Sequence, residues 1–191
     1  MSYHAALTVR PPYRLDLTVD ALRRVHANLV DIMRPGGKYM RALATSDLGM
    51  NVVVVRQLDA TTLDVRIAGQ RARQQLGTVS RMLGVEVDLC SWYRRAAAIP
   101  WLDRLADEFR GLKPPRYPDL WEALCNAIVF QQLSIQAGAA VMARFVDRFS
   151  KPVRRDGVTL YPFPCPRAIL AATPRQVQSV GLTRMKASYH T

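Results

Sequence analysis

The 21 residues from Ala123 to Ala143 contain no charged side chain, and this stretch constrains the fold more than any other. Its length matches a membrane-spanning helix, which needs about 20 mostly apolar residues. Polar side chains interrupt the stretch, however, and polar groups are expensive in lipid. They are Asn126, Gln131, Gln132, Ser134 and Gln136. We therefore predict a pair of helices buried in a protein core, and no membrane partner.

The polar tetrapeptide Gln131–Ser134 divides this stretch into two predicted helices. Asp119 is placed to cap the first helix and Ser134 the second, because short polar side chains accept hydrogen bonds from the free amides of a first helical turn. The second helix should end near Phe149, since Lys151-Pro152 follows. The residues expected to face inward are Leu120, Leu124 and Ile128 in the first helix, and Val141, Phe145 and Phe149 in the second.

Residues 1–96 have the pattern of an α+β domain. Helices are expected at about 22–29 and 70–83, where apolar side chains recur at helical spacing. Apolar and polar residues alternate with the period of half-buried strands in four segments. These segments are 13–19, 38–45, 50–58 and 63–67. The sequence therefore predicts an antiparallel sheet with flanking helices.

No convincing alternation follows this domain, so the rest of the chain is expected to be all α-helical. Residues 97–118 are interpreted as a connecting helix and a stiff, proline-rich linker, and 119–191 as part of a helical domain. Pro166 and Pro174 suit the first turns of two short helices, and a last helix is expected to start at Thr183.

Basic residues outnumber acidic ones by 27 to 15, which gives a net charge of +12. Such an excess is typical of proteins that bind phosphate-bearing partners, although a generally arginine-rich composition would have the same effect. The excess is greatest near the end of the sequence, where residues 148–191 hold eight basic residues and one acid, Asp156. This segment is the best candidate for contact with a nucleic-acid backbone, and the alternative is a solvated basic face.

Several classes of enzyme lack their sequence signatures here. The three histidines, at 4, 26 and 190, have no Cys or acid at a metal-ligand spacing. Neither common phosphate-binding glycine loop occurs, nor does Gly-x-Ser-x-Gly. The cysteines at 90, 125 and 165 follow neither a disulfide nor a metal pattern. We therefore expect no metal site, and the cysteine usage favours a reducing cytoplasm.

Two adjacent glutamines between apolar helices are unusual in a core, because each amide must find hydrogen-bonding partners. At a helix–helix junction, Gln131 and Gln132 can instead be exposed to a groove. There their amides can hydrogen-bond base edges or probe a stacked duplex. The alternative is that both amides are satisfied within the protein and buttress the loop.

The octapeptide Ala127–Ser134, AIVFQQLS, resembles the A-I-x-x-Q-Q-x-S signature of the helix-hairpin-helix DNA glycosylases. Downstream segments similar to the family's F-P, G-L and K-A positions are Phe163-Pro164, Val180–Thr183 and Lys186-Ala187. Upstream segments that look like the first domain of the DNA-3-methyladenine glycosylase II branch are Pro12-Tyr13, Tyr39–Leu43 and Leu63–Ile67. The resemblance covers nearly the whole chain.

This resemblance implies a monofunctional enzyme of base-excision repair that acts on double-stranded DNA with alkylated bases. Such enzymes flip out a base of the 3-methyladenine type and hydrolyse its N-glycosidic bond. They use an aromatic pocket and one carboxylate, and need no cofactor. Gln132 would stand where the family inserts a wedge into the duplex, and Gln131 beside the extrahelical base. The expected DNA-binding residues are Gln131, Gln132, Ser134, Arg184 and Lys186.

The sequence departs from the family at its C-terminal end. In the family, a Gly-x-Gly hairpin and then the catalytic Asp follow the Lys-Ala helix, whereas this sequence stops at Thr191. The helical glycosylase domain is therefore expected to be incomplete, no catalytic residue is assigned, and the chain alone is expected to be inactive. It is interpreted as a fragment, a truncated reading frame or a protein whose C-terminal half is on another chain. An 8-oxoguanine glycosylase-like relative and a non-catalytic DNA-binding module stay open as alternatives.

Overall fold

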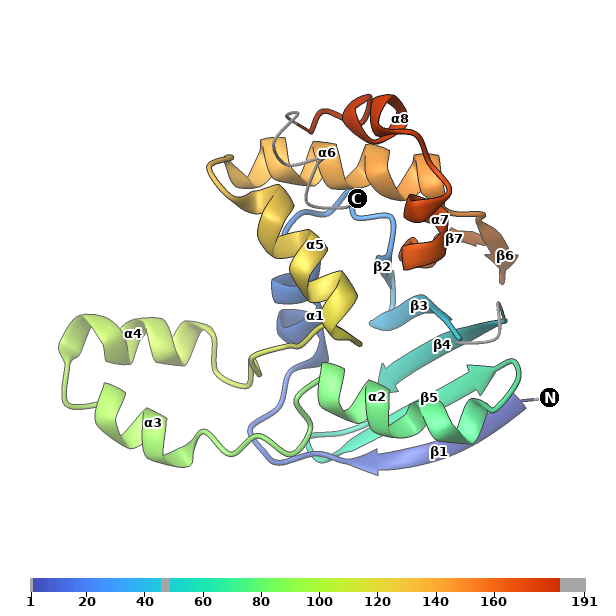
Figure 1. Ribbon diagram of the computed structural model, residues 1–191. Coiled ribbons are helices and arrows are strands. Elements are labelled where there is room, and N and C mark those ends of the chain that lie inside the picture. The colour runs from blue at the N-terminus through green and yellow to red at the C-terminus, as the bar shows by residue number, and fades with distance from the viewer. Residues whose placement is uncertain (1, 46–48, 183–191) are drawn as a thin grey trace.

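The computed structural model describes residues 2–45 and 49–182. A five-stranded antiparallel sheet occupies one side of the molecule and a group of helices the other (Figure 1). The fold class is thus α+β, as the sequence predicted. Residues 46–48, between two of the predicted strands, lie outside the described residues, and so does the helix expected from Thr183.

The sheet has the strand order β1-β5-β4-β3-β2, and every neighbouring pair is antiparallel. Its strands are β1 (Ser2–Thr8), β2 (Asp31–Arg34), β3 (Lys38–Ala44), β4 (Met50–Gln57) and β5 (Thr62–Ala68). The strands predicted at 38–45, 50–58 and 63–67 are therefore confirmed. The short edge strand β2 and the N-terminal strand β1 were not predicted.

The strand predicted at 13–19 and the helix predicted at about 22–29 are both wrong, because the helix here is α1 (Leu15–Arg23) and turns follow it. Leu15 and Val19 fit an alternating pattern, but together with Leu22 they are also spaced i, i+4, i+7 along one helical face. All three side chains are buried against the sheet. A period of two over a few residues could not distinguish the two structures, and packing against the sheet selects the helix.

The predicted helix at 70–83 is present as a 3-10 turn (Ala72–Gln75) followed by α2 (Leu76–Met82). Helices α1 and α2 contribute to one apolar core on the same face of the sheet. The central side chains of this core, Val55, Val65 and Ile67, are fully buried. Their complete burial fixes the strand register, since a shift of one residue would turn them to the other face.

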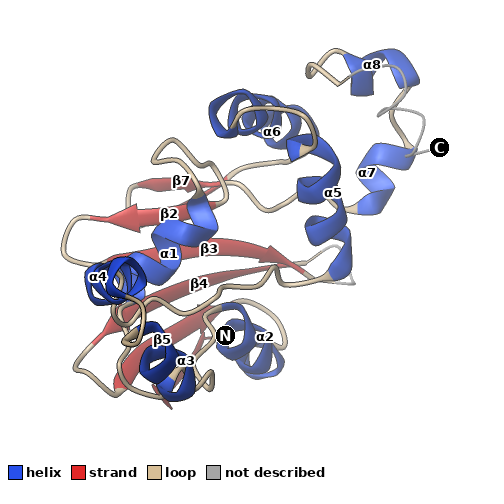
Figure 2. Cartoon of the chain, turned by 90° about the vertical axis from the view of Figure 1, so that its left-hand side faces the viewer, coloured by secondary structure: helices blue, strands red, loops and turns tan. Residues whose placement is uncertain are grey.

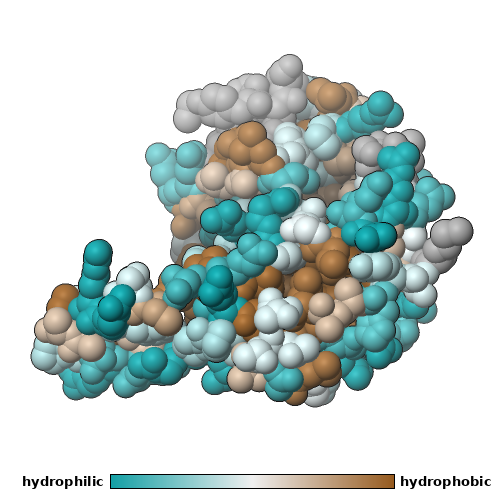
Figure 3. Space-filling model, turned by 90° about the horizontal axis from the view of Figure 1, so that it is seen from below, coloured by the Kyte–Doolittle hydropathy of each residue, from teal (hydrophilic) through white to brown (hydrophobic). Residues whose placement is uncertain are grey.

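Helices α3 (Cys90–Ala96) and α4 (Pro100–Glu108) form an arm that projects from the body of the molecule (Figures 1 and 3). The connecting helix predicted within 97–118 is confirmed as α4, with Pro100 in its first turn. Several large apolar side chains of the arm stay accessible, including Trp101 at 63%. Figure 3 shows these apolar residues interspersed with hydrophilic ones on the arm.

Helices α5 (Leu120–Phe130) and α6 (Ile135–Phe149) form the predicted pair, and both predicted caps are confirmed. The side chains of Asp119 and Ser134 accept hydrogen bonds from the backbone N–H groups of Glu122 and Ala137. The short helices α7 (Pro166–Leu170) and α8 (Pro174–Gln178) begin at the predicted prolines. These helices share a second core, which also includes Val30 from the segment before β2.

The face predicted to point inward on α5 is wrong. The buried residues of this helix are Glu122, Cys125, Asn126 and Val129. Leu120 and Leu124 are instead 73% and 48% exposed. The face of the helix that includes polar residues points inward, because Glu122 forms an ion pair with the buried Arg41 of the sheet. In α6 the expected residues Val141 and Phe145 are buried.

A small hairpin of β6 (Val153–Arg155) and β7 (Val158–Leu160) follows α6, where no strand was expected. Asp156 and Gly157 form its turn with φ of 50° and 72°. Asp-Gly with two positive φ values is the preferred chemistry of a two-residue hairpin. The hairpin packs on the second face of the sheet, against Met40 and Ala42 of β3 (Figure 2).

Within the described part of the chain, no helix combines the length and apolar character needed to cross a membrane.

Candidate functional site

The junction between α5 and α6 places the two predicted glutamines on the surface. Gln131 ends α5 with φ −61° and ψ 128°, and Gln132 follows with φ 60°. A positive φ is uncommon for a residue with a side chain and is often found at functional sites. Gln131, Gln132 and Ser134 are all exposed, so the structure brings three of the predicted DNA-binding residues onto one short loop.

Two apolar side chains accompany these residues on the same surface. Leu133 is 39% and Ile135 55% exposed. The loop therefore presents amide groups beside aliphatic groups, a combination that suits contact with base edges and stacked base faces. The other two predicted DNA-binding residues, Arg184 and Lys186, lie outside the described residues.

The close packing of α5 on α6 holds this loop in place. Gly138, in the first turns of α6, lies against the aromatic ring of Phe130. A Cβ atom at position 138 would lie only 2.5 Å from the nearest ring atom of Phe130. Position 138 therefore requires a glycine, and the resulting contact fixes the path of the chain between the two helices.

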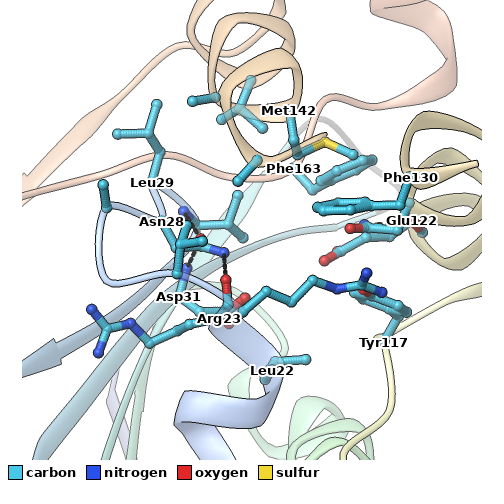
Figure 4. Close-up of a pocket in the computed structure, with 18 residues that line it drawn as sticks. Leu22, Arg23, Asn28, Leu29, Asp31, Tyr117, Glu122, Phe130, Met142 and Phe163 are labelled. Carbon is cyan, nitrogen blue, oxygen red and sulfur yellow. Dashed lines mark hydrogen bonds between the residues drawn. The ribbon is translucent and has the colours of Figure 1, made fainter. Parts of the chain in front are cut away.

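A small aromatic recess lies beside the junction, with a cavity of about 30 Å3 (Figure 4). Phe130, Tyr117, Met142 and Phe163 contribute to its walls. The guanidinium carbon of Arg24 lies 4.2 Å from the ring centroid of Phe130, and Arg24 also donates a hydrogen bond of 3.0 Å to the Tyr117 hydroxyl. This cation–π contact joins α1 to the end of α5, next to the glutamine loop.

A buried charged cluster connects the sheet to α5. Arg41 of β3 is 1% exposed and donates hydrogen bonds to Asp31 of β2, at 2.7 Å, and to Glu122 of α5. Asp31 also accepts a hydrogen bond of 2.6 Å from the Tyr39 hydroxyl. One arginine thus neutralises charge from two elements, and the orientation of α5 relative to the sheet depends on it.

Burial raises the pKa of Glu122 to about 7, and the neighbouring Arg41 opposes part of this increase. Perturbed carboxyl groups occur in active sites, but structural ion pairs produce the same perturbation. Glu122 is 3% exposed and its carboxylate is bound to Arg41, so it is a structural link rather than a catalytic acid. Among the described residues, no group of three or more His, Cys, Asp or Glu side chains is arranged to hold a metal ion.

Sequence reasoning missed the recess and the buried cluster. Arg41 and Glu122 are 81 positions apart, and Arg24 and Tyr117 are 93 apart. No periodicity or local motif relates residues at such separations. The only sequence sign is that Glu122 stands three residues after its helix cap, where an acid is in any case favoured by the helix dipole.

Comparison with known proteins yields one similar sequence and several similar structures, while no protein-family model matches. The chain is 24% identical over 171 residues to DNA-3-methyladenine glycosylase of Bacillus subtilis (strain 168), which covers 89% of the chain. The chain spans about half of that relative's length, namely 55%.

The structural comparisons point in the same direction. The 3-methyladenine DNA-glycosylase from Archaeoglobus fulgidus matches with a TM-score of 0.80 and 22% identity, over 97% of this chain and 64% of that one. The Clostridium acetobutylicum 8-oxoguanine glycosylase/lyase, solved in complex with double-stranded DNA, matches with a TM-score of 0.70 and 17% identity, over 100% and 62%. The chain is thus similar in sequence to a DNA-3-methyladenine glycosylase and shares the fold of the 3-methyladenine and 8-oxoguanine glycosylases.

Proposed function

We propose that this chain forms the duplex-probing part of a base-excision DNA glycosylase that acts on alkylated bases of the 3-methyladenine type. The observation that carries the proposal is the α5–α6 junction, where Gln131 and Gln132 are exposed between two capped helices. The similarity to two 3-methyladenine glycosylases supports it. An 8-oxoguanine glycosylase is the second candidate, supported by a structural match with the lower TM-score of 0.70.

In this proposal, the junction loop enters the duplex at the damaged base pair. Gln132 acts as the wedge, because it is exposed and its φ of 60° lies at the bend between the two helices. Leu133 and Ile135 contact the unstacked neighbouring bases. Gln131 forms hydrogen bonds with bases beside the position that the flipped base has left. Ser134 caps α6 next to the DNA backbone. Flipping costs a few kcal/mol and is easiest for a poorly stacked, damaged base.

Bond cleavage needs a further element in this proposal. Hydrolysis of the N-glycosidic bond proceeds through a cationic sugar that an ionised carboxylate stabilises. The carboxylate of Glu122 is buried and bound to Arg41, so it does not serve this role. We propose that a carboxylate other than that of Glu122 takes this role, and that it is not among the described residues. The purified chain alone is then expected to release no 3-methyladenine from alkylated DNA above a heat-inactivated control.

The wedge can be tested without catalysis by placing 2-aminopurine beside a mismatch in a duplex oligonucleotide. Its fluorescence increases when it loses stacking, so the chain should increase the signal on binding. Gln132→Ala should abolish most of this increase. Gln178→Ala, at the end of α8, is the matched control and should leave it unchanged. An absence of any fluorescence change at saturating protein would contradict the proposed wedge.

A further inference from the structure

The second face of the sheet is only partly covered by the β6–β7 hairpin. Val153, Val158 and Leu160 of the hairpin pack over β3 and part of β4. Beyond the hairpin, the outward residues of β4, β5 and β1 include exposed Arg56, Arg66 and His4. This open part of the sheet carries a set of basic side chains that the proposed wedge does not use.

Three basic residues lie directly opposite one another on neighbouring strands. Arg34 of β2 pairs with Lys38 of β3, and Lys38 pairs in turn with Arg56 of β4. Directly opposed residues point to the same face with their Cβ atoms about 4.5–5.5 Å apart, and like charges in this arrangement are destabilising. Asp156, which is bound to Lys38, and Asp64, which stands directly opposite Arg56, offset part of this repulsion, and a bound anion would offset more.

The acidic residues near this row are already engaged by other cations. Asp64 accepts hydrogen bonds from His4 and Arg66, and Asp156 accepts one of 2.7 Å from Lys38. Arg155 lies 3.7 Å from the Asp156 carboxylate. For Arg34 and Arg56, no ion pair with a carboxylate is formed within residues 2–45 and 49–182. The surface thus keeps a positive excess.

Apart from Arg34, the basic residues line a hollow between the sheet and the hairpin. The hollow has a volume of about 350 Å3. The charged residues that line it are Lys38, Arg56, Asp64, Arg66, Arg155 and Asp156. Val52 and Val54 contribute its apolar part. Its cations come from four strands, so the sheet and the hairpin together hold them in fixed relative positions.

We propose that this row of Arg34, Lys38 and Arg56, with Arg66 and Arg155 beside it, is a second nucleic-acid contact that binds successive phosphates of one backbone strand. Neighbouring strands are 4.7–4.9 Å apart, so the row is about 10 Å long. That length exceeds a single phosphate group and suits an extended polyanion better than a small one. Arginine is also well suited to phosphate because its planar fork donates two parallel hydrogen bonds.

This contact lies on a different side of the molecule from the wedge. In Figure 1 the α5–α6 junction is at the left end of the helical pair, whereas the β6–β7 hairpin lies at the right. We infer that the sheet contact holds a second DNA segment, which would keep the protein on DNA while the junction loop probes base pairs.

The test compares two variants that lose the same charge. Arg34→Gln/Arg56→Gln removes the two cations of the row that lack a carboxylate partner, and Arg94→Gln/Arg104→Gln removes two exposed cations of the α3–α4 arm. Anisotropy of a labelled duplex is measured from 50 to 200 mM salt. The slope of the logarithm of the binding constant against the logarithm of the salt concentration decreases in magnitude by about 0.9 for each lost phosphate contact. The slope should therefore decrease by about 2 in the sheet variant and by less than half of that in the arm variant.

Two further measurements make the result specific. Arg34→Lys/Arg56→Lys keeps the charge and should retain most of the wild-type slope. Duplexes labelled separately with a donor and an acceptor should show energy transfer with the wild-type chain and lose it with the sheet variant. Gln132→Ala should keep the slope, which separates this contact from the wedge. Equal slopes for the sheet and arm variants, or displacement of the duplex by equimolar tripolyphosphate, would overturn the proposal.

Discussion

The sheet and the α5–α6 pair differ in how completely their apolar faces are covered. On the sheet, α1 and α2 bury one face, and the β6–β7 hairpin covers β3 and part of β4 on the other. On α5, one stripe is buried, while Leu120 and Leu124 on the opposite side stay 73% and 48% exposed. The comparison teaches that the sheet region stabilises itself, whereas α5 has a second apolar face that nothing in the described chain covers.

The buried cluster around Arg41 is the strongest specific link between these two regions, and removing it should have the largest effect. Arg41→Met leaves Asp31 and Glu122 as uncompensated buried carboxylates. Breaking a buried ion pair in this way typically costs about 3–5 kcal/mol. We expect a loss of this size in the free energy of unfolding, measured by urea denaturation. The control Arg104→Met, on the exposed surface of α4, should change it by less than about 0.5 kcal/mol.

A second, smaller loss would show whether Arg41 acts through Glu122. In Arg41→Met/Glu122→Leu the buried carboxylate of α5 is removed together with its partner. Replacing both members of a buried pair by apolar groups is often close to neutral, so part of the stability should return. A double variant no more stable than Arg41→Met would mean that Asp31 alone explains the loss.

The packing of α5 on α6 should respond next most strongly to substitution. Gly138→Ala places a methyl group 2.5 Å from the Phe130 ring, and overpacking of this kind costs about 1–3 kcal/mol. Gly77→Ala in α2 is the matched control, because no atom lies within 4 Å of the added group. That change should stabilise the protein by about 0.4–1 kcal/mol. The midpoint of thermal unfolding should decrease for Gly138→Ala and increase for Gly77→Ala. A change of the same sign in both variants would contradict this prediction.

The exposed leucines of α5 should have the smallest effect on stability and a visible effect on association. Leu120→Gln/Leu124→Gln removes apolar surface that no described residue covers. The free energy of unfolding should change by less than about 0.5 kcal/mol per site, whereas binding of a hydrophobic dye should decrease. Val129→Gln, on the buried side of the same helix, should destabilise the protein strongly. A large loss of stability in the leucine variant would mean that this face is packed after all.

Much of the fold was accessible from local patterns. Three strands, the helices α4 to α8 and the caps of α5 and α6 were predicted because period, proline position and capping residues all act within a few residues of one another. The hairpin at Asp156-Gly157 is also encoded locally, because Asp-Gly is a typical turn dipeptide. It was not predicted, because its two strands are too short to show an alternating pattern. The failure at residues 13–19 has the opposite cause, since the local pattern there fits two structures equally.

The candidate site also has a part that local sequence predicts and a part that depends on distant contacts. The loop of Gln131, Gln132 and Ser134 follows from local sequence, because two apolar helices with a polar interruption and a capping serine specify a surface junction. Which face of α5 is buried depends on tertiary contacts, which also bring Arg41 to Glu122. They likewise place Arg34, Lys38 and Arg56 in one row. The physical reason is that capping acts over one helical turn, whereas strand pairing and ion pairs join residues whose separation along the chain carries no periodic signal.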